Sequence, residues 1–542
     1  MAEPKKQNYL HGAAIMTVTT IVVKIIAFAY KIPLGSMSLL GDEGYAHFIV
    51  AYNIYAFFLT LATAGFPVAL SRMITEADTL HRPAQVQRIF RVSFTVLFSI
   101  GAVFTLIMLV FNQPLARIMG DTEANWSIVA LAPAVVIVCM TSAFRGYCQG
   151  LKNMIPTAFG QIIEESGKLV IGLVLAWILI RQGKDLSIAS GGAIFGVTAG
   201  AAGALIYMYL YKRRNYPVMP YGIDDVPDSR RSTLRSFLAI AIPIAIGSTV
   251  LSLVNLLDNG LCLNRLQSAA GFSSTEAHVL YGAYGKAQTF YNLPSYFITP
   301  LTLTIVPAVA SALTEKNRLE ASKMAETALR ITAVVALPMS VGLGVLAGPI
   351  YKTIYWGSHE VGPQLLRSLS PGAFFVCMAM ISNSILQGIH RERIPVLGIA
   401  VGGAIKIGIN WFLVGNPQLN INGAPVGSLC CFLVVCIMDY FFLCKTLEKR
   451  PRLSVIFVGP AISSAVMGVA AWAANGLVYR FIFHEAASRT AMAVSLVAGL
   501  VTAVVVYAVM LGVTKAVTLE DMAMIPKGEK VGKVLHLKKS DQ

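Results

Sequence analysis

The chain has 542 residues, of which 56% are hydrophobic and 13% are charged, and its formal net charge is +16. Soluble domains carry about 25% charged residues, so this composition excludes an ordinary soluble protein and favours one that folds in a lipid bilayer. The apolar stretches are continuous and about 20 residues long, which predicts membrane-spanning helices rather than the alternating pattern of a transmembrane β-barrel.

Taken in chain order, about fourteen apolar segments are long enough to cross a bilayer as helices. The predicted spans are 10–33, 45–71, 89–111, 126–144, 157–180, 190–211, 236–262, 280–312, 327–350, 366–388, 395–414, 422–444, 454–477 and 490–513. The predicted fold class is therefore all-α, a polytopic membrane protein with about 14 transmembrane helices.

The lysines and arginines of the connecting segments predict the orientation of the chain. When the N-terminus is placed in the cytoplasm, most of them fall on the cytoplasmic side, as membrane proteins prefer. Both termini, including a basic tail at 515–542, are predicted to be cytoplasmic. These basic residues are scattered over short loops rather than gathered in a patch, so nucleic acid is not a predicted partner.

The two halves of the chain share a repeated pattern at an offset of 238 residues. The matching elements are VCM at 138–140 and 376–378, QG at 149–150 and 387–388, and Lys168 and Lys406. Transporters built from such repeats place the substrate path between the two halves. The predicted domains are a six-helix lobe at 1–212, a cytoplasmic linker at 213–235, a second six-helix lobe at 236–445, two extra transmembrane helices at 446–514, and the tail at 515–542.

Two local patterns predict how these helices are joined and packed. At each repeated corner, the glycine of the QG pair is expected to supply the tight turn, and Pro156 or Pro395 to open the next helix. Gly192, Gly196 and Gly200 recur every four residues, which predicts a helix face that a neighbouring helix approaches closely. The charge at the first corner is explained by topology, and the alternative is direct substrate contact by Arg145.

Ionisable residues inside membrane spans usually face a cavity or an ionic partner. Lys24 and Lys286 lie on helices of opposite halves, which predicts that both line a central cleft, with Asp258 available to pair with either. An excess of lysine in the cleft suits an anionic ligand, because a desolvated phosphate needs a cation. In the fifth span, Glu164 or Glu165 is expected to pair with a lysine one turn on, Lys168.

The sequence contains no phosphate-binding loop, no HExxH motif and no CxxC pair among its eight cysteines. We therefore predict a protein that is not an enzyme, with no catalytic residue, no metal and no cofactor.

Four stretches of the sequence are distinctive: AGFPVALSRMITE at 64–76, RGYCQGLKNMIPTAFGQIIEESGKL at 145–169, YGAYGKAQTFYNLP at 281–294 and IVPAVASALTE at 305–315. They resemble the oligosaccharide-flippase branch of the MATE-like multidrug/oligosaccharidyl-lipid/polysaccharide exporter superfamily, and within it the stage V sporulation protein B and Gram-positive murein lipid II flippase group.

The resemblance implies two six-helix lobes in a V that open alternately to either side of a bacterial cell membrane. It also implies a substrate, undecaprenyl-diphosphate-linked sugars, and a role for Lys24 and Lys286 in meeting the diphosphate. Asp42 or Glu43 matches an acidic position that follows the first span. Lysine replaces the arginine that relatives often carry at 286, and residues 53–61 lack the arginine that Gram-negative members carry there.

The predicted function is a flippase that moves the murein precursor lipid II from the cytoplasmic to the outer leaflet, with substrate contacts from Lys24, Lys286, Asp258, Asp42 or Glu43 and, as the alternative noted above, Arg145. Its expected partners are the lipid-linked saccharide, membrane lipids and cell-wall synthesis proteins. The alternatives are a flippase for another polyprenyl-linked polysaccharide or spore-cortex unit, a cation-coupled multidrug exporter, and a membrane scaffold that transports nothing.

Overall fold

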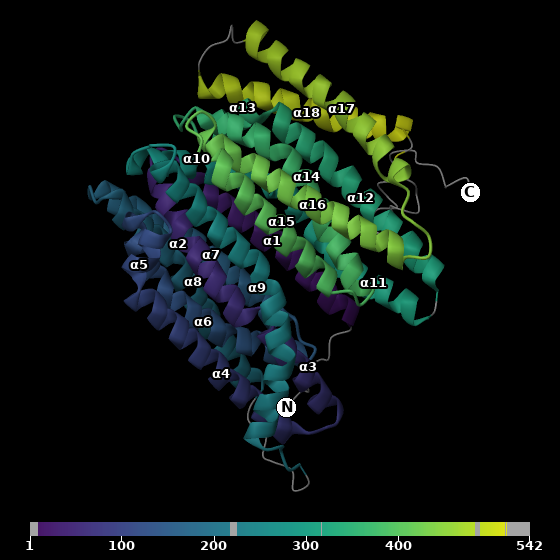
Figure 1. Cartoon of the computed structure of the whole chain (residues 1–542). Coiled ribbons are helices and arrows are strands. Elements are labelled where there is room, and N and C mark those ends of the chain that lie inside the picture. Colours follow the sequence, from purple (N-terminus) through teal and green to yellow (C-terminus); the bar gives the residue numbers. More distant parts are fainter. Residues whose placement is uncertain (1–8, 217–224, 316, 483–487, 515, 517–542) are drawn as a thin grey trace. The chain divides into compact units, whose positions relative to one another are not determined.

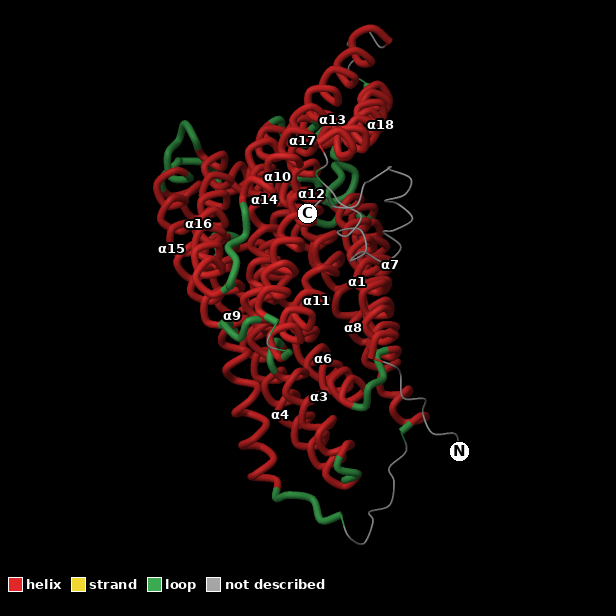
Figure 2. Tube along the Cα trace, turned by 90° about the vertical axis from the view of Figure 1, so that its right-hand side faces the viewer, coloured by secondary structure: helices red, strands yellow, loops and turns green. Residues whose placement is uncertain are grey.

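The computed structural model describes residues 9–216, 225–315, 317–482, 488–514 and 516. Within these residues the chain consists of helices joined by short loops and turns, and it contains no strand (Figure 2). Helices satisfy every backbone hydrogen bond within one segment, which the interior of a bilayer requires because it offers no water. The predicted all-α fold class is confirmed.

Contacts between residues divide the chain into two units, Met1–Gly282 and Ala283–Gln542, and the boundary falls inside α10 (Ser274–Tyr291). Figure 1 labels the helices in chain order. Unit 1 contains α1 (Tyr9–Leu34), α2 (Glu43–Thr63), α3 (Phe66–Thr79), α4 (Pro83–Val110), α5 (Asn112–Ile118), η1 (Thr122–Ala124), α6 (Asn125–Gly150), α7 (Ile155–Arg181), α8 (Leu186–Asn215) and α9 (Arg230–Ser268).

Unit 2 begins within α10 and continues to the end of the described chain. It contains α11 (Leu293–Thr314), α12 (Arg318–Val345), α13 (Ala347–Ile354), α14 (Val361–Gly388), α15 (Arg393–Leu413), η2 (Asn420–Asn422), α16 (Gly423–Thr446), α17 (Leu453–Leu477), η3 (Val478–Ile482) and α18 (Arg489–Thr514). The two six-helix lobes predicted from the repeat divide the chain elsewhere, at 213–235, and remain a prediction. The predicted tail at 515–542 lies outside the described residues except for residue 516.

Among the described residues, 13 helical segments are long and apolar enough to cross a membrane. They correspond to 13 of the predicted spans. The remaining predicted span is α7, a helix of 27 residues that carries Glu164, Glu165 and Lys168 and is therefore less apolar. A count of about 14 transmembrane helices is consistent with these helices.

Three predicted spans are interrupted in the structure. The span predicted at 327–350 is divided between α12, which ends at Val345, and α13, which begins at Ala347. The span predicted at 280–312 is two helices, since α10 ends at Tyr291 and α11 begins at Leu293, with Pro294 in its first turn. The span predicted at 45–71 ends as α2 at Thr63, and α3 follows with a proline in its first turn. Proline lacks an N–H and fits the first turn of a helix, so it begins a new helix within each of the spans predicted at 45–71 and 280–312.

The two QG corners differ from their prediction in one respect. The glycines are the last helical residues of α6 and α14, and the left-handed backbone conformation lies two residues later, at Lys152 (φ 58°) and His390 (φ 61°). Lys152 and His390 occupy equivalent positions of the repeat, 238 residues apart. Glycine therefore does not make these turns, although Pro156 does lie in the first turn of α7 as predicted.

The glycines of the QG pairs instead permit close helix packing. A side chain at Gly150 would lie 2.7 Å from Ile74 of α3, and one at Gly388 would lie 3.0 Å from the backbone oxygen of Val306 on α11. Only glycine allows backbones to approach so closely. The glycines thus permit close packing at equivalent positions of both halves of the repeat, Gly150 against α3 and Gly388 against α11.

The predicted close-packing face of α8 lies against α7. A Cβ atom at Gly200 would be 2.2 Å from the backbone oxygen of Glu164, and one at Gly196 would be 2.5 Å from the backbone nitrogen of Gly172. The prediction of a helix face formed by small residues is confirmed. This contact fixes the part of α7 that carries Glu164, Glu165 and Lys168.

Candidate functional site

A cluster of charged side chains lies where α1 packs against α7 in unit 1. Lys24 and Lys31 are seven residues apart on α1, two helical turns, so they share one face. Lys24 lies close enough to Glu165 and Lys168 for their charges to interact, and Lys31 interacts with the same two residues. The predicted cation of the first span is therefore one member of a larger group.

Lys168 is held in place by several neighbours. Its Nζ atom is 3.3 Å from Oε2 of Glu165, and it lies 5.4 Å from the centres of the Tyr30 and Tyr52 rings. Tyr30 in turn donates a hydrogen bond to the backbone oxygen of Ala193 on α8, at 2.9 Å. The expectation that a glutamate of α7 pairs with Lys168 is confirmed for Glu165. Lys168 is only 6% exposed, so its charge acts on the other members of the cluster rather than on solvent.

The other glutamate of α7 has a different partner. Nη2 of Arg145, near the end of α6, donates a hydrogen bond to Oε2 of Glu164, and both side chains are largely buried. The four cations Lys24, Lys31, Arg145 and Lys168 thus stand against two carboxylates, Glu164 and Glu165, which leaves a net charge of +2 on the cluster. Arg145 is engaged in this ion pair. Its contact with the substrate remains a prediction.

A double variant separates the two roles of Arg145. Arg145→Gln alone is expected to destabilise the protein by about 2 kcal/mol, because it leaves the buried carboxylate of Glu164 without its cation. Adding Glu164→Gln is expected to restore most of the melting temperature, measured in detergent. If the double variant is stable and still transports, Arg145 is structural. If it is stable and inactive, Arg145 contacts the substrate as predicted.

Lys24 is the member of the cluster most accessible to a ligand along α1. Its side chain is partly exposed, and its neighbours Ile21 and Ile25 are 39% and 62% exposed. Arg145 and Lys168, by contrast, point into the contacts described above. A ligand with negative charge can therefore approach the cluster along α1 at Lys24.

Lys286, the predicted cation of the second half, is fully buried in unit 2. Its Nζ atom donates to Oγ of Ser358 at 3.2 Å and lies 5.1 Å from the ring centre of Tyr355. Tyr351 packs against Tyr355 and donates a hydrogen bond to the backbone oxygen of Ala283. Its predicted role in binding substrate remains a prediction, and a substrate reaches Lys286 only if these neighbouring side chains move.

The three predicted carboxylates lie in different surroundings. Asp258 is 1% exposed on α9, and Asp42 is 4% exposed immediately before α2. The backbone of Gly282 approaches that of Asp42 so closely that a Cβ atom at position 282 would lie 1.8 Å from the backbone oxygen of Asp42. Glu43, in the first turn of α2, lies near His47 and His278. The predicted roles of these carboxylates in substrate binding remain predictions.

Three buried titratable groups were not identified from the sequence. His47 and Asp121 form a hydrogen bond at 2.7 Å, and His278 packs edge-on against His47. Burial by itself raises the pKa of the Asp121 carboxyl. The hydrogen bond from His47 and the nearby His278 together lower this pKa by more than burial raises it, so it lies below its usual value. Asp121 and His278 lie outside the predicted spans, and no sequence spacing links them to His47.

Asp439 on α16 is a further residue that the sequence analysis missed. It is fully buried, and neither carboxylate oxygen has a hydrogen-bond partner among the described residues. A buried polar group of this kind is uncommon in folded proteins, where nearly all are paired.

An aromatic cavity of about 950 Å³ lies between α4, α6 and α8 in unit 1. Its lining includes Phe90, Phe94, Phe144 and Tyr209, with Lys212 and Arg213 also present. The Lys212 amine stacks 4.5 Å from the Phe90 ring centre. This lining suits a hydrocarbon chain more than a sugar and is separate from the charged cluster.

Comparison with known proteins places this arrangement in a family. The chain is 25% identical over 535 residues to the uncharacterised membrane protein YabM of Bacillus subtilis (strain 168), covering 98% of this chain and 97% of that protein. It is also 25% identical over 517 residues to the lipid II flippase MurJ of the same organism, covering 91% and 93%. Its identity to stage V sporulation protein B from that organism is 22% over 526 residues, covering 96% and 98%.

The fold is similar to solved structures of transporters. The lipid II flippase MurJ in an inward closed conformation superimposes with a TM-score of 0.65 at 13% identity, covering 91% of this chain and 98% of that one. A multidrug resistance MATE family transporter in an inward-facing conformation gives a TM-score of 0.64 at 16% identity, covering 79% and 97%. At these identities the likeness concerns the fold alone.

Sequence, helices and relatives together identify a multi-pass membrane protein. The sequence pattern of the polysaccharide biosynthesis protein family matches residues 9–313, which is more than half of the chain. The resemblance found in the four sequence motifs is thus confirmed, and the chain belongs to the polysaccharide biosynthesis protein family, with a fold shared by the MATE-like transporters.

Proposed function

We propose that the protein is a flippase that moves a polyprenyl-diphosphate-linked saccharide across the cell membrane, with the murein precursor lipid II as its leading substrate. The observation that carries this proposal is the charged cluster on α1 and α7, with its net charge of +2 and its partly exposed Lys24. A diphosphate entering a membrane protein loses its hydration, and cations of this kind offset that loss.

The proposed mechanism needs no covalent chemistry. The polyprenyl chain stays in the bilayer while the saccharide head crosses between two lobes that open alternately to either side. Lys24 meets the diphosphate, and the ion pairs Glu164–Arg145 and Glu165–Lys168 hold the cluster in shape. The protein acts as a transporter without a cofactor or a catalytic residue.

The proposed orientation places both termini in the cytoplasm. Lysine and arginine are then concentrated in the cytoplasmic loops, as expected for inner-membrane proteins. Helices α17 and α18 are proposed to bind the polyprenyl tail. They pack against each other and expose large apolar side chains, among them Trp472 and Val504.

A second substrate is favoured by one comparison. The similarity to stage V sporulation protein B, at 22% identity, is close to the similarity to MurJ, so another polyprenyl-linked glycan, such as a spore-cortex unit, is the second candidate. A cation-coupled drug exporter is less favoured, because the carboxylates of the cluster are already paired with cations.

Complementation tests the proposal. We expect expression of the chain in a bacterium depleted of its own lipid II flippase to restore survival and the amount of lipid II on the outer leaflet. Absence of rescue, by a protein shown to be folded in the membrane, would contradict the lipid II assignment and favour another lipid-linked glycan. A strain depleted of the flippase for a different polyprenyl-linked glycan then tests the second candidate.

A further inference from the structure

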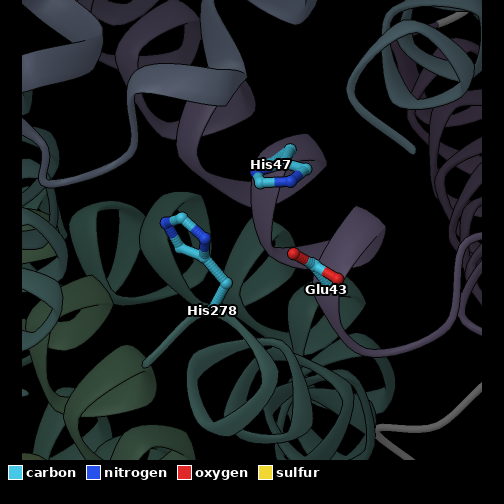
Figure 3. A group of neighbouring side chains, drawn as sticks. All are labelled: Glu43, His47 and His278. Atoms are coloured by element: carbon cyan, nitrogen blue, oxygen red, sulfur yellow. The ribbon is translucent and has the colours of Figure 1, made fainter. Parts of the chain in front are cut away.

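A second cluster of polar side chains lies within unit 1, where α2, the first part of α10 and the turn before η1 meet. Glu43 and His47 are one turn apart on α2, and His278 lies on α10. Figure 3 shows the three side chains directed toward a common space. One ligand atom from each residue lies within 4.8 Å of the other two.

Both imidazole rings are buried, and each has one nitrogen that forms no hydrogen bond among the described residues. His47 is 0% exposed and His278 is 1% exposed, and this nitrogen is Nε2 in both rings. Two carboxylate oxygens lie close to these nitrogens: Oε2 of Glu123 is 3.3 Å from Nε2 of His47, and Oδ1 of Asp121 is 3.4 Å from Nε2 of His278. Leaving a buried polar atom unsatisfied costs about 1–3 kcal/mol. The two rings, whose centres are 5.0 Å apart, therefore offer two imidazole nitrogens that one ion could bind together.

Asp121 determines which nitrogen of His47 is available. Nδ1 of His47 is 2.7 Å from Oδ2 of Asp121, while Oδ1 of Asp121 accepts hydrogen bonds from the backbone N–H groups of Glu123 and Ala124. An ionised carboxylate only accepts, so Nδ1 of His47 donates, and in the neutral ring, the form that binds a metal, Nε2 then carries the lone pair. Metal-binding histidines in proteins are usually oriented by a carboxylate in this way.

The charges of the cluster also favour a cation. Glu43, Asp121 and Glu123 bring three carboxylates next to two histidines, and Oε2 of Glu123 is 3.3 Å from Nε2 of His47. A divalent ion offsets most of this negative charge. The side chain of Glu123 is 58% exposed, so an ion can enter from solvent on that side.

We propose that Glu43, His47 and His278 bind a divalent transition-metal ion of the zinc class. Glu123 or a water molecule supplies a fourth ligand, and Asp121 orients His47. Two imidazoles with carboxylate oxygens suit zinc and its neighbours, whereas magnesium and calcium prefer oxygen alone. Ligands about 2.1 Å from a tetrahedral zinc ion lie about 3.4 Å apart, so side-chain shifts of little more than about 1 Å complete the site.

Such an ion joins three segments that are far apart in the sequence. It ties the start of α2 and the turn at Asp121 to the first turns of α10, which is anchored here by the close approach of Gly282 to Asp42. Binding is therefore expected to stabilise this end of unit 1. The site is distinct from the charged cluster at Lys24, and its occupancy can be measured without any transport assay.

Metal content tests the proposal directly. The full chain, purified in detergent without a histidine tag, is loaded with Zn²⁺, desalted and analysed for zinc by mass spectrometry. We expect about one tightly bound ion per chain. Glu43→Gln and His278→Gln each remove one ligand, and we expect at least about tenfold weaker zinc affinity, as does Asp121→Asn through the orientation of His47.

His81→Asn is the matched control. His81 is exposed, lies elsewhere in unit 1 and has a positive φ of 53° that asparagine tolerates, so zinc binding should be unchanged. Melting curves in EDTA show whether each variant is folded, and added zinc should raise the melting temperature of wild type and His81→Asn only. Zinc binding that is absent in wild type, or equal in wild type and in folded Glu43→Gln and His278→Gln, overturns the proposal.

Discussion

Replacing Lys24 by alanine is expected to reduce flipping of a diphosphate-linked lipid by roughly ten- to hundred-fold, because a charge-assisted contact contributes about 1.5–3 kcal/mol. Lys24 is a partly exposed cation of the cluster, and the Arg145–Glu164 and Lys168–Glu165 ion pairs do not involve the substituted side chain. The measurement is the rate at which a fluorescent lipid II analogue in proteoliposomes becomes accessible to a membrane-impermeant quencher.

Two variants make this result interpretable. Lys24→Arg keeps the charge and offers a fork of donors that matches phosphate, so it should retain most of the transport rate. Lys184→Ala removes an exposed lysine from the loop between α7 and α8 and should transport as wild type. A folded Lys24→Ala protein with the wild-type rate would show that this lysine does not bind the diphosphate.

The substitution Gly200→Ala is expected to lower the stability of the protein by about 3 kcal/mol, because the added methyl group overpacks a closed contact. Its Cβ atom would lie 2.2 Å from the backbone oxygen of Glu164 and 2.9 Å from the backbone nitrogen of Lys168. Neither atom can turn away, so α7 and α8 must separate. Thermal unfolding in detergent measures the change in stability.

Gly203→Ala, one turn further along α8, is the matched control for this experiment. Its Cβ atom would lie 3.4 Å from a methyl group of Ile163, an ordinary contact. Alanine also favours a helix over glycine by about 1 kcal/mol, so this variant should be as stable as wild type or slightly more so. Equal stability of the two variants would contradict the role of Gly200 in close packing.

Transport by Gly200→Ala is expected to fall even where the protein still folds. The displaced segment of α7 carries Glu164, Glu165 and Lys168, so the geometry of the charged cluster changes with it. The contact between α7 and α8 therefore links the stability of unit 1 to the site proposed for the diphosphate.

The sequence alone determined the all-helical membrane fold, about 14 spans and the family, because apolar length and local motifs depend only on neighbouring residues. It also predicted that Glu164 or Glu165 pairs with Lys168, and that α8 packs closely at Gly200, since residues three or four apart share a helix face. These features need no knowledge of which helices meet.

Contacts between distant segments were decided only by the tertiary structure. Arg145 and Glu164 are 19 residues apart across a corner, and the sequence does not say which glutamate of α7 faces α6. The glycines of the QG pairs were assigned to turns, because their contacts with α3 and α11 are not visible in the local pattern. At these turns the left-handed backbone conformation is adopted by Lys152 and His390, and no sequence rule identifies these two residues.

The cluster of His47 and His278 illustrates the same limit at the proposed metal site. A lone histidine in an apolar segment carries no signal, and His47 and His278 are 231 residues apart. Folding brings them together with Glu43 and Asp121 because α10 approaches the start of α2, where glycine at 282 leaves room. Hydropathy and spacing report on single helices, and the chemistry of this protein arises where several helices meet.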